Sequence, residues 1–364
     1  MKLLPSSDER DLASMLSKLF DAECPVSLVR EMHDGRTKPD RLWKALADAG
    51  VFGLLVPPEH DGAGGALTDL GVFYVEAGRA LCPTIVHGTL HAAFAIQVLG
   101  GPDQQAAWLP SLADGKLSAT TCLSSVRNAA DVTPTLRARS DGEVWRLDGA
   151  VDFVSDADLA DYVVVTASAP DLTLGFVVPL EAVGLKPQPL MGGHRAFRLV
   201  FQDVEIADRT AVLGESGLAV EDLRRVANAA VALQSLDLVG VGEAALQRTV
   251  EYTKARKQFG RPIASFQAAQ HLVANMHIAL AAARLAAHSA VFSIGQGHTA
   301  NRQTAIARMH AGAAAKLITL DAHQLHGGMG YVVDTDLHLF SERARVLSTL
   351  GGGADIAATW MEES

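Results

Sequence analysis

The spacing of apolar residues over the first 120 residues is typical of helices joined by short polar turns. Leu12, Leu16 and Leu19 recur at helical spacing after Ser6, which forms a predicted capping box with Glu9. A run of prolines and glycines from 57 to 65 then excludes a continuing helix. The other helices predicted in this part are 40–49, 67–80 and 89–99.

From about residue 118 the pattern changes to that of strands. Runs of four to eight residues rich in Val, Phe and Thr alternate with polar turns. Asp141-Gly142 and Asp148-Gly149 are predicted as turns between strands. We therefore expect a barrel-like, antiparallel β domain over 118–213.

After Gly214 the helical period returns and continues to the end of the chain. The helices predicted there are 218–257, 266–294, 301–325, 337–350 and 354–361. Small residues dominate their faces, which favours close packing in a four-helix bundle. The predicted fold is therefore α+β, with an all-α domain over 1–117, a β domain over 118–213 and a helical bundle over 214–364.

Composition narrows the class of protein. The 364 residues are 49% hydrophobic and 20% charged, which indicates an ordered chain, and the net charge of −10 argues against sequence-independent binding to nucleic acid. Three widely spaced cysteines fit a reducing compartment, so we expect a cytoplasmic protein. The most apolar long stretch, 277–294, contains Arg284 and His288, which favours a bundle helix over a membrane span.

Two stretches of the bundle are more specific than composition. They are YTKARKQFGRPIASFQAAQ (252–270) and QLHGGMGYVVDTDLHLFSERAR (324–345). With the α–β–α order and the segment VPPEHDGAGG, they resemble the acyl-CoA dehydrogenase family over nearly the whole chain. The resemblance implies FAD, an acyl-CoA substrate and a tetramer. It also implies that a carboxylate takes the α proton while the flavin takes the β hydride.

In the family, one end of the bundle reaches FAD that is bound mainly by the neighbouring subunit. The resemblance assigns Arg256 to the FAD pyrophosphate, with Phe259 beside it, and a guanidinium suits phosphate because its donors form a planar fork. The alternative is a C-terminal helix arginine favoured by the helix dipole, with Phe259 in the core. Gln267 is open between a flavin contact and helix surface.

A second contact with the neighbour's FAD is implied for the start of the 324–345 motif. There Gln324 would meet the adenosine end, and Gly327 and Gly328 would allow a close approach of backbone to ligand. The alternative is a helix that simply ends at a glycine cap. Both statements hold together, because a capped helix end is where such a contact would lie.

The residues that the resemblance assigns to the flavin ring of the same subunit differ from the family pattern. Ser124 stands where the family has a threonine, and Phe153 and Ser155 stand in the next flavin segment. Asp156 brings a negative charge where a neutral amide is usual. Phe153 is otherwise a candidate for plain β-domain core.

The family's catalytic base is absent from both positions at which it occurs. Alignment through SERARVLSTLGGGADI places Gly351 at one position, and the spacing from the RxxFG motif places Ala230 at the other. Neither residue can accept a proton, so the sequence predicts no catalytic residue in this chain. We expect the carboxylates on the same helix to be at the surface or paired with Arg224, Arg225 or Arg248; they are Glu221, Asp222, Asp237 and Glu243.

The pattern of loss favours a partner subunit. Residues that would serve the neighbour's FAD are kept, and those that would serve the chain's own flavin are not. The chain thus resembles the non-catalytic-type subunit of bacterial α2β2 acyl-CoA dehydrogenases, a group that includes enzymes acting on CoA esters of steroid side chains. We expect a paralogous subunit as partner, or else a homo-oligomer. Two alternatives stay open: a flavin monooxygenase of the same fold, which needs no glutamate base, and a flavin-free scaffold.

Overall fold

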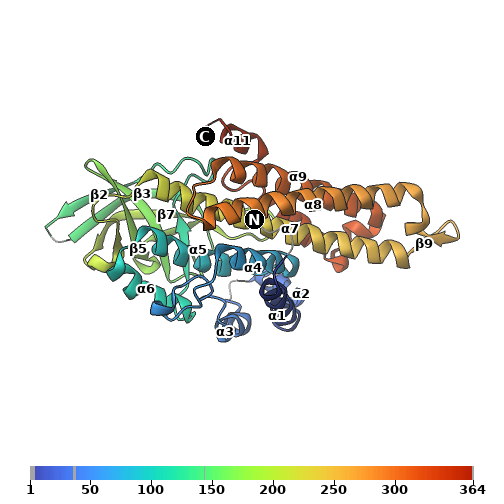
Figure 1. The fold of residues 1–364 in the computed structure, drawn as a ribbon, viewed down its shortest axis with the longest axis horizontal. Helices are drawn as coiled ribbons and strands as arrows, with labels where there is room; N and C mark the ends of the chain where they lie inside the picture. The colour runs from blue at the N-terminus through green and yellow to red at the C-terminus, as the bar shows by residue number, and fades with distance from the viewer. Residues whose placement is uncertain (1–4, 36–37, 143, 363–364) are drawn as a thin grey trace.

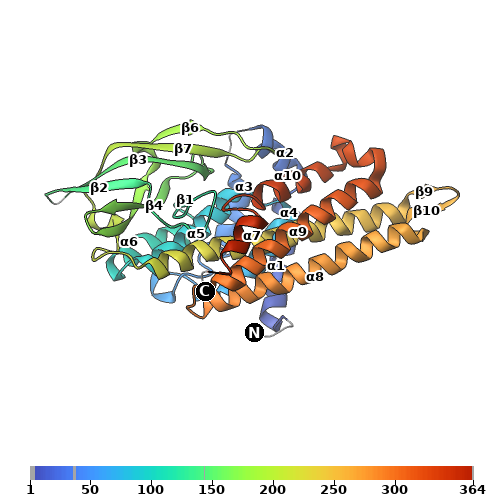
Figure 2. The same cartoon turned by 90° about the horizontal axis from the view of Figure 1, so that it is seen from above.

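The computed structural model describes residues 5–35, 38–142 and 144–362. The molecule is elongated, with a β domain at one end and long helices that run along its axis to the other (Figures 1 and 2). The order is helical domain, β-sheet domain and helical bundle, so the predicted fold class is confirmed.

The N-terminal part is a set of helices that pack beside the bundle. They are α1 (Ser7–Glu23), α2 (Val26–Asp34), α3 (Asp40–Asp48), the short 3-10 helix η1 (Pro58–His60), α4 (Leu67–Ala80), α5 (Thr84–Leu99) and α6 (Pro102–Ala113). The capping box is present, because the Glu9 amide donates to Ser6 Oγ at 3.1 Å and the Ser6 amide donates to Glu9 Oε2 at 2.7 Å. Helices α2 and α6 are additional to the prediction, and α6 continues through Pro110.

The middle part is one eight-stranded sheet. Its strands are β1 (Ala119–Cys122), β2 (Leu136–Asp141), β3 (Val144–Ser155), β4 (Tyr162–Ala169), β5 (Leu172–Pro179), β6 (Gly184–Pro187), β7 (Ala196–Ile206) and β8 (Val212–Leu213). Most pairs are antiparallel, but β1 and β2 each pair with β4 in parallel, which the turn signals do not predict.

One predicted turn is wrong. Asp141-Gly142 does lie at the β2–β3 hairpin, where Gly142 has φ +69°. Asp148-Gly149 instead lies inside β3, at a shift of register against β7. Gly149 has φ +130°, so its freedom at positive φ serves a bulge in a continuous strand rather than a reversal of the chain.

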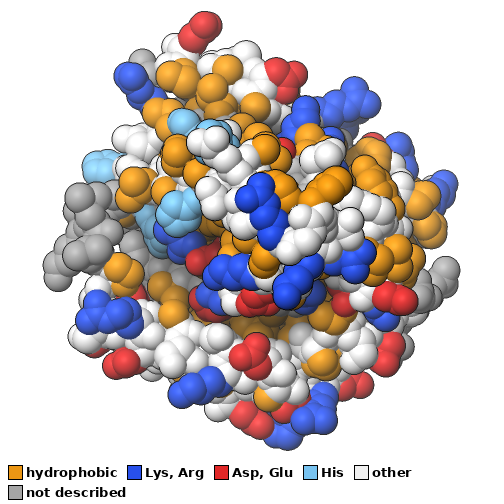
Figure 3. Space-filling view, turned by 90° about the vertical axis from the view of Figure 1, so that its right-hand side faces the viewer, with side chains coloured by type: hydrophobic (Ala, Val, Ile, Leu, Met, Phe, Trp, Pro, Cys, Tyr) orange, Lys and Arg blue, Asp and Glu red, His pale blue; other side chains and the backbone are white. Residues whose placement is uncertain are grey.

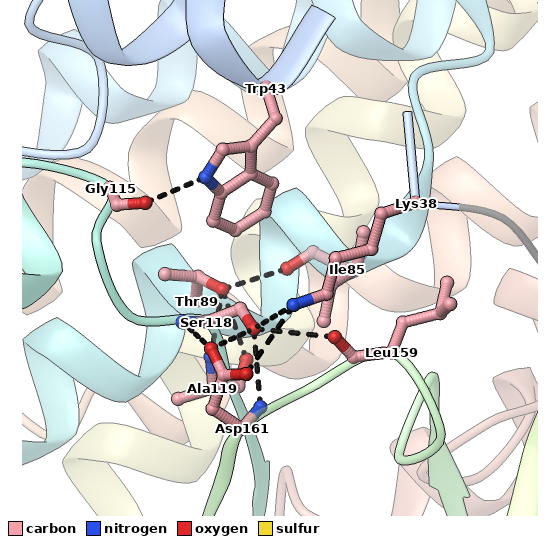
Figure 4. Close-up of polar contacts among 9 residues, drawn as sticks. All are labelled: Lys38, Trp43, Ile85, Thr89, Gly115, Ser118, Ala119, Leu159 and Asp161. Carbon is pink, nitrogen blue, oxygen red and sulfur yellow. Dashed lines mark hydrogen bonds and ion pairs between the residues drawn. The ribbon is translucent and has the colours of Figure 1, made fainter. Parts of the chain in front are cut away.

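A polar network joins the N-terminal helices to the sheet (Figure 4). Lys38 Nζ lies 3.0 Å from Ser118 Oγ, which donates to Asp161 Oδ2 at 2.7 Å. The Ser118 amide donates to the same carboxylate at 2.8 Å, and the Ala119 amide donates to Thr89 Oγ1 at 3.0 Å. Residues from α5, the start of β1 and the loop before β4 are thus tied together at one point.

The C-terminal part consists of three long helices and two short ones, namely α7 (Val220–Ala255), α8 (Gln267–Gly295), α9 (Asn301–His326), α10 (Leu337–Leu347) and α11 (Ala354–Thr359). A small hairpin of β9 (Lys257–Gln258) and β10 (Arg261–Pro262) joins α7 to α8. Helices α4 and α7 meet backbone to backbone: a Cβ on Gly78 would overlap the Asp237 carbonyl, and one on Gly240 would overlap the Val75 carbonyl.

Two helices of the described residues, α7 and α8, are long and apolar enough to cross a membrane by length and composition alone. In the most apolar window, 78% of α7 is buried inside the protein, against 33% of α8. A core helix of a bundle passes the same test, so α7 is explained by its packing.

Candidate functional site

A cavity of about 170 Å³ lies where the sheet, α5, α7 and the turn after α10 meet. Five residues singled out from the sequence line it together; they are Ser124, Phe153, Ser155, Ala230 and Gly351. They come from the loop after β1, the end of β3, the middle of α7 and the α10–α11 turn. The structure thus brings the flavin-ring positions and both base positions of the resemblance to one place.

The end of β3 is shaped by backbone irregularity. Phe153 has φ +56° at a register shift against β7, and its amide donates to Gln188 Oε1 at 2.7 Å. The Ser155 carbonyl accepts from Thr120 Oγ1 at 2.8 Å. These bonds hold a bulge that turns the end of the strand toward the cavity.

Asp156 follows directly and is buried. Burial raises the pKa of its carboxyl to about 6, against the opposing effect of Thr84, whose Oγ1 donates to Oδ2 at 2.5 Å. The negative charge expected at this position from the sequence is therefore retained at neutral pH, held by a hydroxyl donor.

Gly351 is fixed against the loop after β1. Its amide donates to the Val126 carbonyl at 2.7 Å, and its carbonyl accepts from the Ala129 amide at 2.8 Å. Its φ is +77°, and a Cβ there would lie 3.3 Å from Ala129 Cβ. This base position therefore lacks a carboxylate, and its backbone is also held by hydrogen bonds at a positive φ that favours glycine, with the neighbouring loop packed against it.

A buried arginine that the sequence gave no reason to select holds the same turn. Arg308 of α9 is 0% exposed, and it donates to the carbonyls of Gly352 at 3.0 Å, Leu347 at 2.5 Å and Leu350. Burial lowers the pKa of its guanidinium to about 10, so the group is still charged at neutral pH. Three backbone carbonyls take the place of a carboxylate partner.

The prediction for Asp237 is wrong. It is completely buried rather than at the surface, and its partner is Arg343 of α10 rather than any arginine of α7. Arg343 Nε donates to Oδ1 at 2.9 Å and Nη2 to Oδ2 at 2.5 Å, and His87 Nε2 lies 3.0 Å from Oδ2. Burial raises the pKa of the Asp237 carboxyl, but the Arg343 guanidinium outweighs burial and holds that pKa well below its usual range.

Glu243, further along α7, also differs from the expectation. Its Oε2 accepts from Arg284 Nη2 of α8 at 2.8 Å, and Arg79 of α4 lies 3.9 Å away. The arginine within the apolar stretch of α8 is thus neutralised across the bundle.

The remaining predicted residues lie at the opposite end of the bundle. All are exposed; they are Arg256, Phe259, Gln267, Gln324, Gly327 and Gly328. Arg256 follows the last turn of α7, 26 residues after Ala230, which is about 39 Å along a helix. Phe259 is 92% exposed at φ +53°, so it is not a core residue.

That end of the molecule presents apolar, histidine and cationic side chains together (Figure 3). The η5 turn (Gly327–Tyr331) follows α9 there, with Tyr331 82% exposed and its ring stacked on His323. Arg261 of the hairpin lies over the ring of Phe266, at the start of α8, at 4.1 Å, so a guanidinium meets an aromatic face there. Exposed rings beside guanidinium groups suit a ligand with a planar base and phosphates.

The two ends differ in their fit to FAD. Pockets that take a whole ligand usually measure roughly 300–1,000 Å³, and the cavity of about 170 Å³ has a polar backbone loop closed over Gly351. The cavity of this chain is therefore too small to enclose a whole FAD molecule. The exposed end instead presents the Arg256 guanidinium, the Phe259 ring and the Gln324 amide to solvent.

Known family descriptions match the first and the last of the three parts of the chain. Residues 6–116 match the family description "Acyl-CoA dehydrogenase, N-terminal domain", and residues 222–364 match "Acyl-CoA dehydrogenase, C-terminal domain". Among solved structures, a variant of the steroid acyl-CoA dehydrogenase Tcur3481–Tcur3483 superposes with a TM-score of 0.85 at 27% identity, covering 98% of this chain and 97% of that one. The fold and its cavity thus define the acyl-CoA dehydrogenase class.

Two relatives match nearly the whole length of this chain. "Acyl-CoA dehydrogenase IpdE2" of Mycobacterium tuberculosis is 30% identical over 94% of this chain and 92% of its own length. The "3-(aryl)acrylate reductase" of Clostridium sporogenes is 27% identical over 96% of both chains. The chain belongs to the acyl-CoA dehydrogenase family, a family of oxidoreductases that typically bind FAD.

Proposed function

We propose that this chain is the base-lacking subunit of an FAD-dependent acyl-CoA dehydrogenase, and that it completes an FAD site in a paralogous partner subunit. The observation that carries the proposal is the contrast between the two ends of α7. The cavity end has no free proton acceptor at either base position, while the hairpin end presents exposed groups suited to phosphate and adenine.

The contacts of the neighbouring carboxylates do not favour either of them as a replacement for the missing base. Asp237 lines the cavity, but both of its oxygens accept from Arg343, and its lowered pKa makes it a weak base. Glu243 is engaged by Arg284. Loss of a general base typically costs about 10²–10⁴ in rate, so the lone chain should not dehydrogenate acyl-CoA at a useful rate.

The exposed end cannot serve the chain's own cavity, because about 39 Å of helix separates them. Arg256, Phe259 and Gln324 instead point outward, where a second chain would bring its cofactor. The name of the steroid enzyme that superposes at 27% identity joins two proteins, Tcur3481 and Tcur3483, which is consistent with a two-chain assembly. A CoA ester of a fatty acid or steroid side chain is the proposed substrate, and the cytoplasm the proposed location.

Co-expression with the paralogous chain tests the proposal. We expect one FAD per two chains and dehydrogenase activity in the complex, with neither FAD nor activity in this chain alone. Arg256→Met should lower the FAD content of the complex, and Lys254→Met, a nearby exposed cation, serves as the matched control. Stoichiometric FAD and robust turnover in the lone chain would overturn the proposal.

The flavin-free scaffold is a second candidate, favoured by the small cavity and by the loop bonded over Gly351. The same experiment separates the two functions. A stable complex whose FAD content and affinity are unaffected by Arg256→Met would favour the scaffold.

A further inference from the structure

The loop between β6 and β7 inserts a histidine into the middle of the molecule. Gly192 and Gly193 have φ +67° and +65°, and a Cβ on either would overlap a side chain of α10 or α2. Arg195 donates to the Gly35 carbonyl at 2.5 Å and pairs with Asp158. The loop is therefore anchored on both sides of His194.

His194 forms a wall between two cavities. It lines the cavity of about 170 Å³ described above and a second cavity of about 80 Å³ behind it, toward α2 and α10. Gln234 of α7 lines the larger cavity one helical turn after Ala230. His194 and Gln234 are both partly exposed, and neither the His194 ring nor the Gln234 amide hydrogen-bonds to another residue of the described parts of the chain, so two polar groups face this space without a protein partner.

The charges around this wall are already balanced. Arg343, which lines the smaller cavity, donates to both oxygens of Asp237 and to the Cys82 carbonyl at 2.8 Å. Burial lowers the pKa of His194 to about 3 and that of His87 below its ordinary value, so both rings are neutral. Three other charged residues of the described chain line the two cavities, and each has a partner. Asp152 pairs with Arg198, Asp156 accepts a hydrogen bond from Thr84, and Arg195 pairs with Asp158.

A negatively charged ligand group would therefore enter a space whose described lining has carboxylates and no free cation. A purely apolar group would displace water from His194 and Gln234 without supplying a hydrogen bond in its place, which costs free energy. A neutral oxygen avoids both problems, because a neutral imidazole offers one donor and one acceptor and an amide offers both. At roughly 30 Å³ per water, the larger cavity has room for about six water molecules, the size of a short acyl group.

We propose that this cavity binds the acyl part of a CoA ester that carries a neutral hydroxyl or keto oxygen, and that His194 and Gln234 bind that oxygen. The proposal rests on the acyl-CoA chemistry of the proposed function, and not on which subunit supplies the base. It makes the cavity a selective binding site in the subunit that lacks the base.

Calorimetric titration of the full-length lone chain with three four-carbon esters tests it: butanoyl-CoA, 3-hydroxybutanoyl-CoA and succinyl-CoA. One neutral hydrogen bond predicts that the hydroxy ester binds roughly 2- to 12-fold tighter than butanoyl-CoA, and that succinyl-CoA binds weakest. Gln234→Leu and His194→Phe should each reduce this preference, and His194→Gln should retain part of it. His277→Phe and Gln296→Leu, both exposed on or beside α8, should leave it unchanged.

Equal affinity for the hydroxy and unsubstituted esters overturns the inference, as does tightest binding of succinyl-CoA or no binding of any ester. A preference that survives in Gln234→Leu and His194→Phe overturns it as well. Each of these results leaves the partner-subunit proposal standing, because that proposal is decided by FAD stoichiometry and activity of the two-chain complex.

Discussion

Replacement of Arg308 by methionine should unfold the protein more easily and loosen the turn at Gly351. The arginine is fully buried, and its guanidinium donates to three carbonyls of the α10–α11 segment. Methionine keeps the length and apolar stem of the side chain but supplies no donor. The carbonyls of Leu347, Leu350 and Gly352 then lose a partner together.

The magnitude follows from those three groups. An unpartnered buried acceptor costs about 1–3 kcal/mol, so three cost at least ~3 kcal/mol. Removal of a buried cation returns part of its desolvation penalty, which keeps the net loss near ~3 kcal/mol rather than at the upper end. With an unfolding entropy of ~2.1 cal/mol/K per residue, 364 residues give a fall in Tm of about 4 °C.

Urea denaturation and a thermal scan of Arg308→Met beside Arg302→Met provide the measurement. Arg302 lies on the same helix but is exposed, so its replacement should change stability by less than ~0.5 kcal/mol. Hydrogen exchange should show faster exchange at the amides of Gly351 and Ala129, which close the turn. If Arg308→Met matches Arg302→Met in both stability and exchange, the guanidinium does not hold this turn.

Three further predictions follow from buried contacts. Asp237→Asn leaves the Arg343 charge unpaired and should lower the free energy of unfolding by about 3–5 kcal/mol at pH 7. Because the pKa of Asp237 is lowered in the folded state, its contribution to stability is present above pH ~4 and is lost as the pH falls further. The urea midpoints of the variant and the wild type should therefore converge in acid. Gly78→Ala places a Cβ that would overlap the Asp237 carbonyl, so it should destabilise the protein by at least ~2 kcal/mol in the same denaturation assay. Gly312→Ala on α9 is the control: its Cβ would have its nearest neighbour at 3.6 Å, so the change should be neutral or stabilising by up to ~1 kcal/mol. Gly351→Glu should lower Tm and restore no dehydrogenase activity to the lone chain, because φ is +77° and Ala129 crowds the new Cβ; recovered turnover would contradict this account of the site.

The order of domains and most helices could be predicted because they depend on local periodicity. The capping box at Ser6 and the long helices α7, α8 and α9 all fall close to the predicted ranges. The parallel pairing of β1 and β2 with β4 could not be predicted, because it depends on which distant strands meet. The bulge at Gly149 shares its Asp-Gly signal with a turn, and only pairing with β7 distinguishes the two.

The site was predictable only where a motif marks it. Ser124, Phe153, Ser155, Ala230 and Gly351 were selected through the family resemblance, and they do line one cavity. Arg308 carries no such mark, and the 324–345 motif that contains Arg343 assigns that arginine no role, because the importance of both comes from partners 39 to 261 residues away. His194 has no mark either, because its place between the two cavities depends on how its loop is anchored. The prediction for Asp237 was wrong for the same reason. An acid on an amphipathic helix normally faces water, and it is buried only where an arginine distant in the sequence pairs with it.

The glycine crossing of α4 and α7 gives the molecule the geometry of a lever. Gly78 and Gly240 let the two backbones touch there, so a slide of α7 along its axis would drive neighbouring side chains into the α4 backbone, and any tilt of α7 would turn about this contact. From this fulcrum the helix runs 15 residues to its end at Ala255, about 23 Å. A tilt of about 5° would move that tip by about 2 Å, the difference between a hydrogen bond and none. In the proposed two-chain assembly, a shift of that size at Arg256 would be enough to make or release a phosphate contact with the partner's cofactor.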